Sequence, residues 1–310
     1  MHIVPNPCMK DRTSLGIGGR AQAEARIEHP GDWEDIHLFL EREGLCPLIV
    51  GRGSNLLMQD GNLPLCLIVP QKQPQPEIVV QTRDQVVVRV GAGFSLPRLL
   101  RWLQERGLAG LEGLAGIPAS VGGAVSMNAG SFGQCLGDRL HRVRCWNSAT
   151  GLMWLHRHDL DLAYRFFQPR GLAGQWFIQE VELRLIPSDA GELRKRLRGF
   201  WDRKRQTQPV GERTCGCTFK NPELAAAGLL LDRCGMRGKQ AGEVGFSSLH
   251  ANFLLNKGRG RFDQAWEMIS EARSRVLQRY GLRLELEVQI IDPESAAGTA
   301  CACSWTGGTP

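Results

Sequence analysis

Apolar and polar positions alternate along several short stretches of the chain, and such alternation predicts half-buried strands. The clearest stretch runs from 21 to 28, where small or apolar side chains occupy every second position. Short β-branched or aliphatic runs, and two later alternations, predict further strands. We expect these strands at residues 48–50, 85–90, 141–146, 177–185 and 282–291.

Other stretches repeat their apolar residues at helical spacing. Asp32 is expected to be the N-cap of a helix that ends near Gly44, and Ser95 the N-cap of one that ends near Gly107. A basic helix should run from Gly191 to just before Pro209, and a short one from 225 to 234. A long helix is expected at 262–280, with an apolar face of Phe262, Trp266, Ile269, Val276 and Tyr280. Strands and helices in this order predict an α+β protein.

At 310 residues the chain is long for a single core, so several units are expected. A stretch rich in proline and glutamine at 70–76 is typical of a linker or surface loop, and the basic helix ends a second unit. We therefore predict units at 1–70, 71–205 and 206–292. The remaining residues, 293–310, are small and polar, which predicts a disordered tail.

The balance of charge changes this picture little, with 38 basic against 32 acidic residues and no basic block interleaved with aromatics. A nucleic-acid partner is therefore not indicated.

The N-terminus lacks the pattern of a secretory signal, and no run approaches the ~20 apolar residues that span a bilayer, so we expect a cytoplasmic protein without a membrane partner. Ten cysteines without a C-x-x-C pair disfavour a zinc site, and we expect no metal.

Three glycine-rich loops are candidates for binding an anion or cofactor. The loop at 16–21 matches the pattern G-x-G-x-x-G/A, but polar residues precede it and a predicted strand follows it, so it does not fit the dinucleotide fingerprint. The loop at 51–55 follows a buried strand and suits an anion-binding nest. The loop at 116–130 is long and nearly uncharged, as a segment that wraps a planar cofactor would be. Tight turns between strands are the alternative interpretation of each loop.

The residues 216–222 combine a thiol, a cation and an amide beside one glycine. Cys217 can give or take a proton, Lys220 suits a phosphate or carboxylate, and Pro222 stiffens the exit of the turn. A turn with incidental polar residues is the alternative. We interpret this stretch as part of a functional site.

These motifs together resemble those of the UDP-N-acetylenolpyruvoylglucosamine reductase family. The resemblance runs from about Thr13 to Ile291, in consistent order and spacing. It rests on the stretches at 13–21, 51–57, 113–130, 164–165, 216–222, 250–256 and 284–288.

The resemblance implies an α+β chain with an FAD-binding fold of the vanillyl-alcohol-oxidase (PCMH) type in two subdomains, plus a C-terminal α+β domain that covers the substrate. It implies that NADPH reduces FAD, and that the flavin then passes hydride to UDP-N-acetylglucosamine enolpyruvate, giving UDP-N-acetylmuramate for peptidoglycan. The first two glycine loops would carry the FAD pyrophosphate, and the third the flavin and ribityl chain. The implied cofactor contacts are Gly51, Gly53, Ser54, Asn55, Leu56, Gly116, Ile117, Pro118, Ser120, Gly122, Gly123, Ala124, Asn128 and Gly130.

The resemblance also implies three catalytic residues. Arg165 would be the cation beside the developing negative charge, Cys217 the acid that protonates C2, and Glu287 its assistant. The family has a serine where this chain has Cys217, and a thiol, with an unperturbed pKa of about 8.5, should keep the role. Without the resemblance, Glu287 reads as the solvated face of a strand. The implied substrate contacts are Tyr164, Lys220 and Asn221.

The chain departs from the family at two further positions, with Gln289 where arginine is common and Asp292 where glycine is usual. It has only two tyrosines, which fits the type that lacks a tyrosine clamp loop. Two alternatives stay open: an oxidase of another sugar on the same fold, and a nucleotide-binding protein in which the cysteine marks a loss of catalysis.

Overall fold

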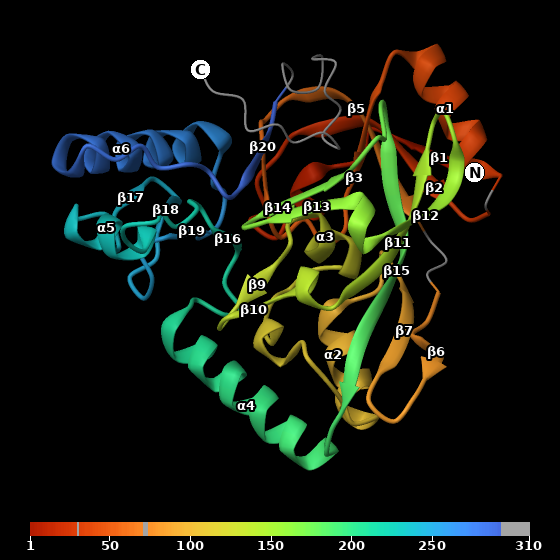
Figure 1. Ribbon diagram of the computed structural model, residues 1–310. Coiled ribbons are helices and arrows are strands. Elements are labelled where there is room, and N and C mark those ends of the chain that lie inside the picture. Colours follow the sequence, from red (N-terminus) through yellow and green to blue (C-terminus); the bar gives the residue numbers. More distant parts are fainter. Residues whose placement is uncertain (30, 71–73, 293–310) are drawn as a thin grey trace.

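The computed structural model describes residues 1–29, 31–70 and 74–292, and it mixes helices with mostly antiparallel strands. Figure 1 shows the N-terminal unit in red and orange, the middle unit from orange to green, and the C-terminal unit in teal and blue. The predicted α+β class is confirmed. The predicted tail at 293–310 and the centre of the predicted linker lie outside the described residues, and the three unit boundaries stay a prediction.

The first sheet has the strand order β1-β2-β5-β3. Its pairs are parallel except β1 with β2. Alternation at 21–28 and the buried run at 48–50 correctly located two of its strands. Helix α1 packs its indole Trp33 against Trp146 and Phe177 of the second sheet, with ring centres 5.9 and 5.6 Å away. The elements here are β1 (His2–Pro5), β2 (Arg20–Ile27), α1 (Asp32–Glu43), β3 (Cys46–Ile49), β4 (Leu56–Met58) and β5 (Asn62–Pro70).

Asp32 is the first residue of α1 rather than its N-cap, which is Gly31. The expectation that Asp32 is the N-cap was wrong, because the Asp32 carboxylate binds groups that precede the helix instead of the N–H groups of its first turn. It accepts hydrogen bonds from the backbone N–H groups of Glu28 and His29 and binds the amino group of Met1 at 2.9 Å. These contacts hold the pKa of Asp32 at about 2.

The second sheet has the order β12-β11-β15-β7-β6 and is antiparallel throughout. The predicted strands at 85–90, 141–146 and 177–185 are confirmed as β7, β11 and β15. Ser95 stands at the N-cap of α2 as expected, but its side chain makes no capping bond. Its backbone instead pairs with Ser120. The elements are β6 (Glu77–Gln81), β7 (Val86–Gly91), α2 (Leu96–Glu105), β8 (Leu108–Ala109), β11 (Leu140–Asn147), β12 (Gly151–His156) and β15 (Trp176–Pro187).

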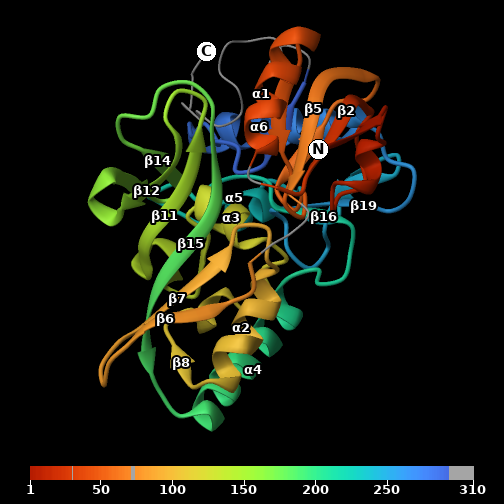
Figure 2. The same ribbon diagram turned by 90° about the vertical axis from the view of Figure 1, so that its right-hand side faces the viewer.

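Between these strands the glycine-rich loop at 116–130 contains a short helix that we did not predict, α3 (Val121–Ser126). Ser120 caps it by accepting a hydrogen bond from the Gly123 N–H at 3.2 Å. The predicted basic helix is α4 (Ala190–Thr207), which runs beside α2 in Figure 2. Two hairpins complete the unit: β9 (Gly130–Ser131) with β10 (Gln134–Cys135), and β13 (Leu160–Ala163) with β14 (Phe166–Pro169).

The third sheet has the order β16-β19-β18-β17, packed against α5 and α6. The long predicted helix is confirmed as α6, but its buried face is Ala265, Met268, Ile269, Ala272 and Val276. Trp266 is 39% exposed, because the inward face is set by the smaller residues on either side of it. None of the helices described is both long and apolar enough to cross a membrane. The elements are β16 (Thr214–Cys217), α5 (Ala227–Arg233), β17 (Gln240–Ala241), β18 (Val244–Phe246), β19 (Phe253–Asn256) and α6 (Phe262–Tyr280).

The closing strand predicted at 282–291 is much shorter than expected, since only β20 (Gln289–Ile291) is a regular strand. It pairs in parallel with β4 of the first unit, far away in the sequence. The residues before β20 lie beside the stretch after β16: Phe219 pairs with Leu286, and the Glu287 N–H donates to the Thr218 carbonyl at 2.9 Å. The C-terminal unit is therefore joined to the first unit by its last strand.

Candidate active site

A cavity of about 1010 Å³ lies where the three units meet. This volume is at the upper limit of ordinary ligand pockets, which span ~300–1,000 Å³. Its wall comes from the loops at 51–55 and 116–130, the turn between β13 and β14, helices α2 and α4, and strand β16. A cavity of this size has room for a large, extended ligand.

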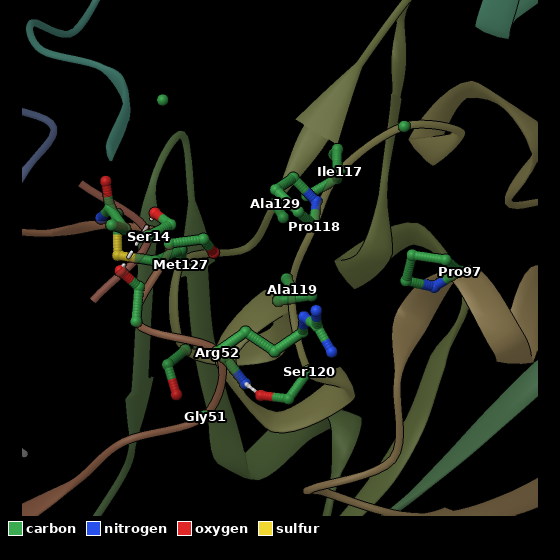
Figure 3. A pocket seen from close by; sticks show the side chains of 18 of the residues that line it. Ser14, Gly51, Arg52, Pro97, Ile117, Pro118, Ala119, Ser120, Met127 and Ala129 are labelled. Carbon is green, nitrogen blue, oxygen red and sulfur yellow. Dashed lines mark hydrogen bonds between the residues drawn. The ribbon is translucent and has the colours of Figure 1, made fainter. Parts of the chain in front are cut away.

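Two of the glycine loops press against each other at one wall of this cavity, as Figure 3 shows for Gly51 and Ser120. A Cβ atom on Gly51 would lie 2.1 Å from the Ser120 hydroxyl oxygen, and one on Gly122 would lie 2.7 Å from the Cβ of Ala92. Both distances are far below van der Waals contact. Glycine is favoured at Gly51 because the two loops approach closely there, and at Gly122 because the residues after β7 lie against it; the small residues also keep the wall open to a ligand.

All the expected cofactor contacts except one line this cavity. They are Gly51, Gly53, Ser54, Asn55, Leu56, Gly116, Ile117, Pro118, Ser120, Gly122, Gly123, Ala124 and Gly130. The exception is Asn128, whose buried amide donates to the Ala163 carbonyl at 2.8 Å and accepts from the Gly137 N–H at 2.9 Å. The Asn128 side chain therefore holds the loop in place, and its contact with the cofactor stays a prediction.

The first glycine loop also has a different place from the one expected. No residue of 16–21 lines the cavity, although Ser14 just before it does. A Cβ on Gly19 would lie 1.8 Å from the carbonyl oxygen of Gly61, so this glycine serves close packing against the turn before β5. The expectation that this loop carries a pyrophosphate therefore has no support in the geometry.

The three expected catalytic residues do come together. Arg165, Cys217 and Glu287 all line the cavity, and Arg165 Nε donates to Glu287 Oε1 at 2.6 Å. Arg165 also donates to the Gly130 carbonyl at 3.2 Å, and its backbone is left-handed, with φ of +55°. Such a conformation is costly for a non-glycine residue and is typical of a position where function demands it. The Glu287 side chain is only 13% exposed, so it does not lie on a solvated strand face.

Burial controls the protonation of Cys217 and Glu287. Burial raises the pKa of the Cys217 thiol to about 12, the charge of Glu287 adds to the effect, and the cations of Arg165 and Lys204 oppose it. Burial also raises the pKa of Glu287, against the opposing charge of Arg165. At neutral pH the sulfur therefore carries its proton, as a general acid must.

The expected substrate contacts Tyr164, Lys220 and Asn221 lie beside these residues but do not line the cavity. The Tyr164 hydroxyl accepts a hydrogen bond from the Asn221 N–H at 3.3 Å, which connects the turn between β13 and β14 to the third unit. Lys220 forms an ion pair with Glu285 at 3.2 Å. Their role in binding a substrate stays a prediction.

Asn55 makes a structural contact that its sequence position did not indicate. The Asn55 side-chain amide donates to the backbone carbonyl of Glu287 at 2.9 Å. The backbone carbonyl of Asn55 accepts a hydrogen bond from the Gln289 N–H, also at 2.9 Å. The loop at 51–55 and the segment that carries Glu287 are therefore tied together.

The sequence analysis missed Lys204, which is 3% exposed on α4 and lines the cavity. Burial lowers the pKa of Lys204 to about 8, and the Arg165 cation also lowers it. Helical spacing could have found it, because the sequence Leu193, Leu197, Trp201 and Lys204 falls on one face of α4. In the described part of the chain, no three cysteine, histidine or acidic side chains lie close enough together to share a metal ion.

Comparisons with known proteins agree with this arrangement. A family profile described as "UDP-N-acetylenolpyruvoylglucosamine reductase, C-terminal domain" matches residues 208–291, and a profile described as "FAD binding domain" matches residues 21–155. A protein named UDP-N-acetylenolpyruvoylglucosamine reductase from Oleidesulfovibrio alaskensis is 45% identical over 93% of this chain and 97% of its own length. One of the same name from Nitratidesulfovibrio vulgaris is 42% identical over 94% and 99%.

A solved structure is similar over the same span. The crystal structure of a UDP-N-acetylenolpyruvylglucosamine reductase from Thermus caldophilus superimposes with a TM-score of 0.77 at 31% identity, and covers 94% of this chain and all of its own. Together with the FAD-binding profile, this likeness confirms the FAD-binding fold that the sequence motifs implied.

Proposed function

This chain belongs to the UDP-N-acetylenolpyruvoylglucosamine reductase family, and on that premise we propose that it reduces UDP-N-acetylglucosamine enolpyruvate to UDP-N-acetylmuramate for peptidoglycan synthesis. The enzyme uses FAD, and NADPH as the source of electrons is part of the proposal. The observation that carries the proposal is the convergence of Arg165, Cys217 and Glu287 on one cavity bounded by the glycine loops.

The cavity fits FAD. Its volume suits a dinucleotide, and the two opposed loops present small residues that let a ligand approach the backbone. The loop at 51–55 would hold the pyrophosphate, and the loop at 116–130 the flavin end. When bound, the flavin supplies hydride to C3 of the enolpyruvyl double bond.

Arg165 would stabilise the charge that this addition creates. Negative charge builds at C2 and in the attached carboxylate, where a fixed cation lowers the barrier. The 2.6 Å hydrogen bond to Glu287 and the contact with the Gly130 carbonyl hold the guanidinium in one orientation. Because the charge of Arg165 is already fixed in place, little reorganisation is needed during the reaction.

Cys217 would complete the reaction by giving its proton to C2. The S–H bond breaks, a C–H bond forms, and the electron pair of the S–H bond stays on sulfur. The raised pKa of Cys217 keeps the thiol protonated beforehand. Glu287 and Cys217 line the same cavity, and their charges are coupled, so Glu287 is placed to assist this transfer.

An absorption spectrum of the pure protein tests the proposal directly. We expect flavin bands that bleach on addition of NADPH and return when the enolpyruvyl nucleotide is added. Reoxidation by oxygen alone, with no response to the nucleotide, would favour an oxidase. A colourless protein that takes up no added FAD would refute the proposal.

A further inference from the structure

The turn between β13 and β14 holds Arg165 in a costly conformation. Tyr164 and Arg165 are the two residues of this turn, which is closed by the pairing of Ala163 with Phe166. Arg165 is left-handed, with φ of +55°. At the second residue of a two-residue turn this conformation normally requires glycine or asparagine. An arginine keeps it only where the surrounding structure holds the backbone in place, so the turn needs an anchor.

Asn128 is hydrogen-bonded to the start of this turn. Its side-chain amide donates to the backbone carbonyl of Ala163 at 2.8 Å, and its side-chain oxygen accepts from the Gly137 N–H at 2.9 Å. Asn128 is 7% exposed, and a Cβ on Gly137 would lie 2.6 Å from the same oxygen, so the side chain has little room to rotate. Both ends of the amide are therefore bound to backbone groups, and one of these groups lies two residues before Arg165.

The same short segment of the third glycine loop also binds the tip of the Arg165 side chain. Gly130, two residues after Asn128, accepts a hydrogen bond from the Arg165 guanidinium at 3.2 Å. The loop lies against the hairpin that carries the arginine, as Figure 1 shows for α3 and β14. Residues 128–130 therefore contact both the backbone beside Arg165 and its charged group, while Glu287 binds the guanidinium from the C-terminal unit at 2.6 Å.

We propose that Asn128 is a positioning residue for Arg165: by holding the Ala163 carbonyl it fixes the turn from which the guanidinium reaches the cavity. This inference rests on the proposed function, in which Arg165 stabilises the charge that develops on the substrate. A misplacement of about 1 Å can cost on the order of 10²-fold in rate. Asn128 should therefore matter most in the step in which that charge develops, the reoxidation of flavin by the enolpyruvyl nucleotide.

The test removes one hydrogen bond with a residue of the same shape. Asn128→Asp keeps the oxygen that accepts from the Gly137 N–H but places a second oxygen against the Ala163 carbonyl. In stopped-flow absorbance we expect reoxidation by the enolpyruvyl nucleotide to slow on the order of tenfold or more, while reduction by NADPH changes less than about twofold.

Asn147→Asp is the matched control. Asn147 is a buried asparagine of the same unit that lies outside the cavity, and its amide also donates to a backbone carbonyl, that of Ala173, at 2.8 Å. Its oxygen accepts from the Ala149 N–H at 3.0 Å. The control variant therefore suffers the same kind of damage to a loop and should leave the rates of both half-reactions unchanged.

A measurement without substrate separates this inference from the proposed function. Phenylglyoxal modifies accessible arginine side chains, and peptide mass spectrometry maps the sites. In the flavin-loaded enzyme we expect Arg165, whose side chain is 16% exposed, to react several-fold faster in Asn128→Asp than in the wild type, relative to the exposed Arg83. In Asn147→Asp the reactivity of Arg165 should equal that of the wild type.

Asn128→Gly takes the place of Asn128→Asp if the aspartate variant does not fold, because glycine readily adopts the left-handed backbone at this position, with φ of +38°, and lacks the amide. Unchanged reoxidation together with unchanged Arg165 reactivity would overturn the inference. Equal slowing of both half-reactions would also overturn it, as would a loss of FAD affinity without slower reoxidation, since Asn128 would then be structural or a cofactor contact. If the wild type does not turn over the enolpyruvyl nucleotide, the proposed function fails, and the phenylglyoxal comparison still decides whether Asn128 holds Arg165.

Discussion

Arg165 Nε lies 2.6 Å from Glu287 Oε1, although 122 residues separate the two in the chain. Their side chains are 16% and 13% exposed, so the pair is shielded from solvent. Removal of either partner would leave the other charge buried and alone, which is strongly destabilising. The pair therefore joins the middle unit to the C-terminal unit at the point where the substrate is expected to react.

Replacement of Cys217 tests the proton donor. We expect Cys217→Ser to keep most of the activity, because a hydroxyl can occupy the same place and donate a proton. Cys217→Ala should slow the reoxidation of flavin by substrate on the order of 10²-fold, as loss of a general acid does. Stopped-flow absorbance measures both half-reactions, and equal rates in wild type and Cys217→Ala would remove Cys217 from the mechanism.

Replacement of Glu287 separates the two half-reactions. We expect Glu287→Gln to slow flavin reoxidation by the enolpyruvyl nucleotide while leaving flavin reduction by NADPH unchanged, because only the first needs proton transfer. Glu267→Gln, on the exposed side of α6, is the matched control and should change neither rate. If Glu287→Gln slows both halves alike, the residue has a structural role only.

Asn55→Asp should weaken the link between the loop at 51–55 and Glu287. The variant places a carboxylate oxygen against the Glu287 carbonyl, where an N–H donor was before. We expect a loss of about 1–3 kcal/mol in the free energy of unfolding and slower reoxidation. Urea unfolding measures the first effect. Asn62→Ala, at the exposed start of β5, should cost less than about 0.5 kcal/mol. If Asn55→Asp lowers the free energy of unfolding no more than Asn62→Ala does, the link between Asn55 and Glu287 is unimportant for stability.

Gly51→Ala should reduce the affinity for FAD about tenfold or more, since its Cβ would meet the Ser120 hydroxyl at 2.1 Å and force the two loops apart. Titration of the flavin-depleted protein with FAD, followed by flavin fluorescence, measures the affinity. The added mutation Ser120→Ala should restore part of it, because it removes the clashing oxygen. Gly31→Ala, with open space at its Cβ, is the control that should bind FAD normally. Unchanged FAD binding by Gly51→Ala would mean that the loops need not touch.

The buried ammonium of Lys204 should cost stability at neutral pH. Its pKa is lowered from 10.5 to about 8, so between these values the folded protein binds fewer protons than the unfolded chain, and stability rises with pH. We expect flavin-depleted Lys204→Met to exceed the wild type by about 1–3 kcal/mol in the free energy of unfolding at pH 7. The difference should shrink toward pH 10.5. A variant that is less stable than wild type at pH 7 would show that the ammonium is well compensated.

In the described part of the chain, the pattern of apolar positions located every α-helix except α3, but only the longer strands β2, β7, β11 and β15 and the buried strand β3. Amphipathic elements such as β2 and α6 bury one face in a local layer, whereas most of the short strands carry no such pattern. The pattern misjudged the segment that ends in β20, since there the partners come from β4 and from the stretch after β16, which periodicity does not reveal. The motif resemblance singled out Arg165, Cys217 and Glu287, and all three line one cavity. It did not show that Asn128 holds its own loop, because that depends on the carbonyl of Ala163 and the N–H of Gly137.

Helix α4 shows a further limit of sequence reasoning. Its many basic residues suggest a solvated surface, and most of them are indeed exposed. Lys204 differs only in the face of the helix that it occupies. Three-dimensional placement, and not residue type, separates this lysine from its neighbours.

The parallel pairing of β20 with β4 has a consequence for how the enzyme is made. Glu287 lies just before β20, so nearly the whole chain must leave the ribosome before the glutamate can reach Arg165. Strand β4 of the first unit has no β20 to pair with until nearly the end of synthesis. This pairing is a non-local contact, and such contacts slow folding. Nascent chains that stop short of this segment would carry the glycine loops at 51–55 and 116–130 without Glu287, so the proposed site is complete only after the last strand described has been synthesised.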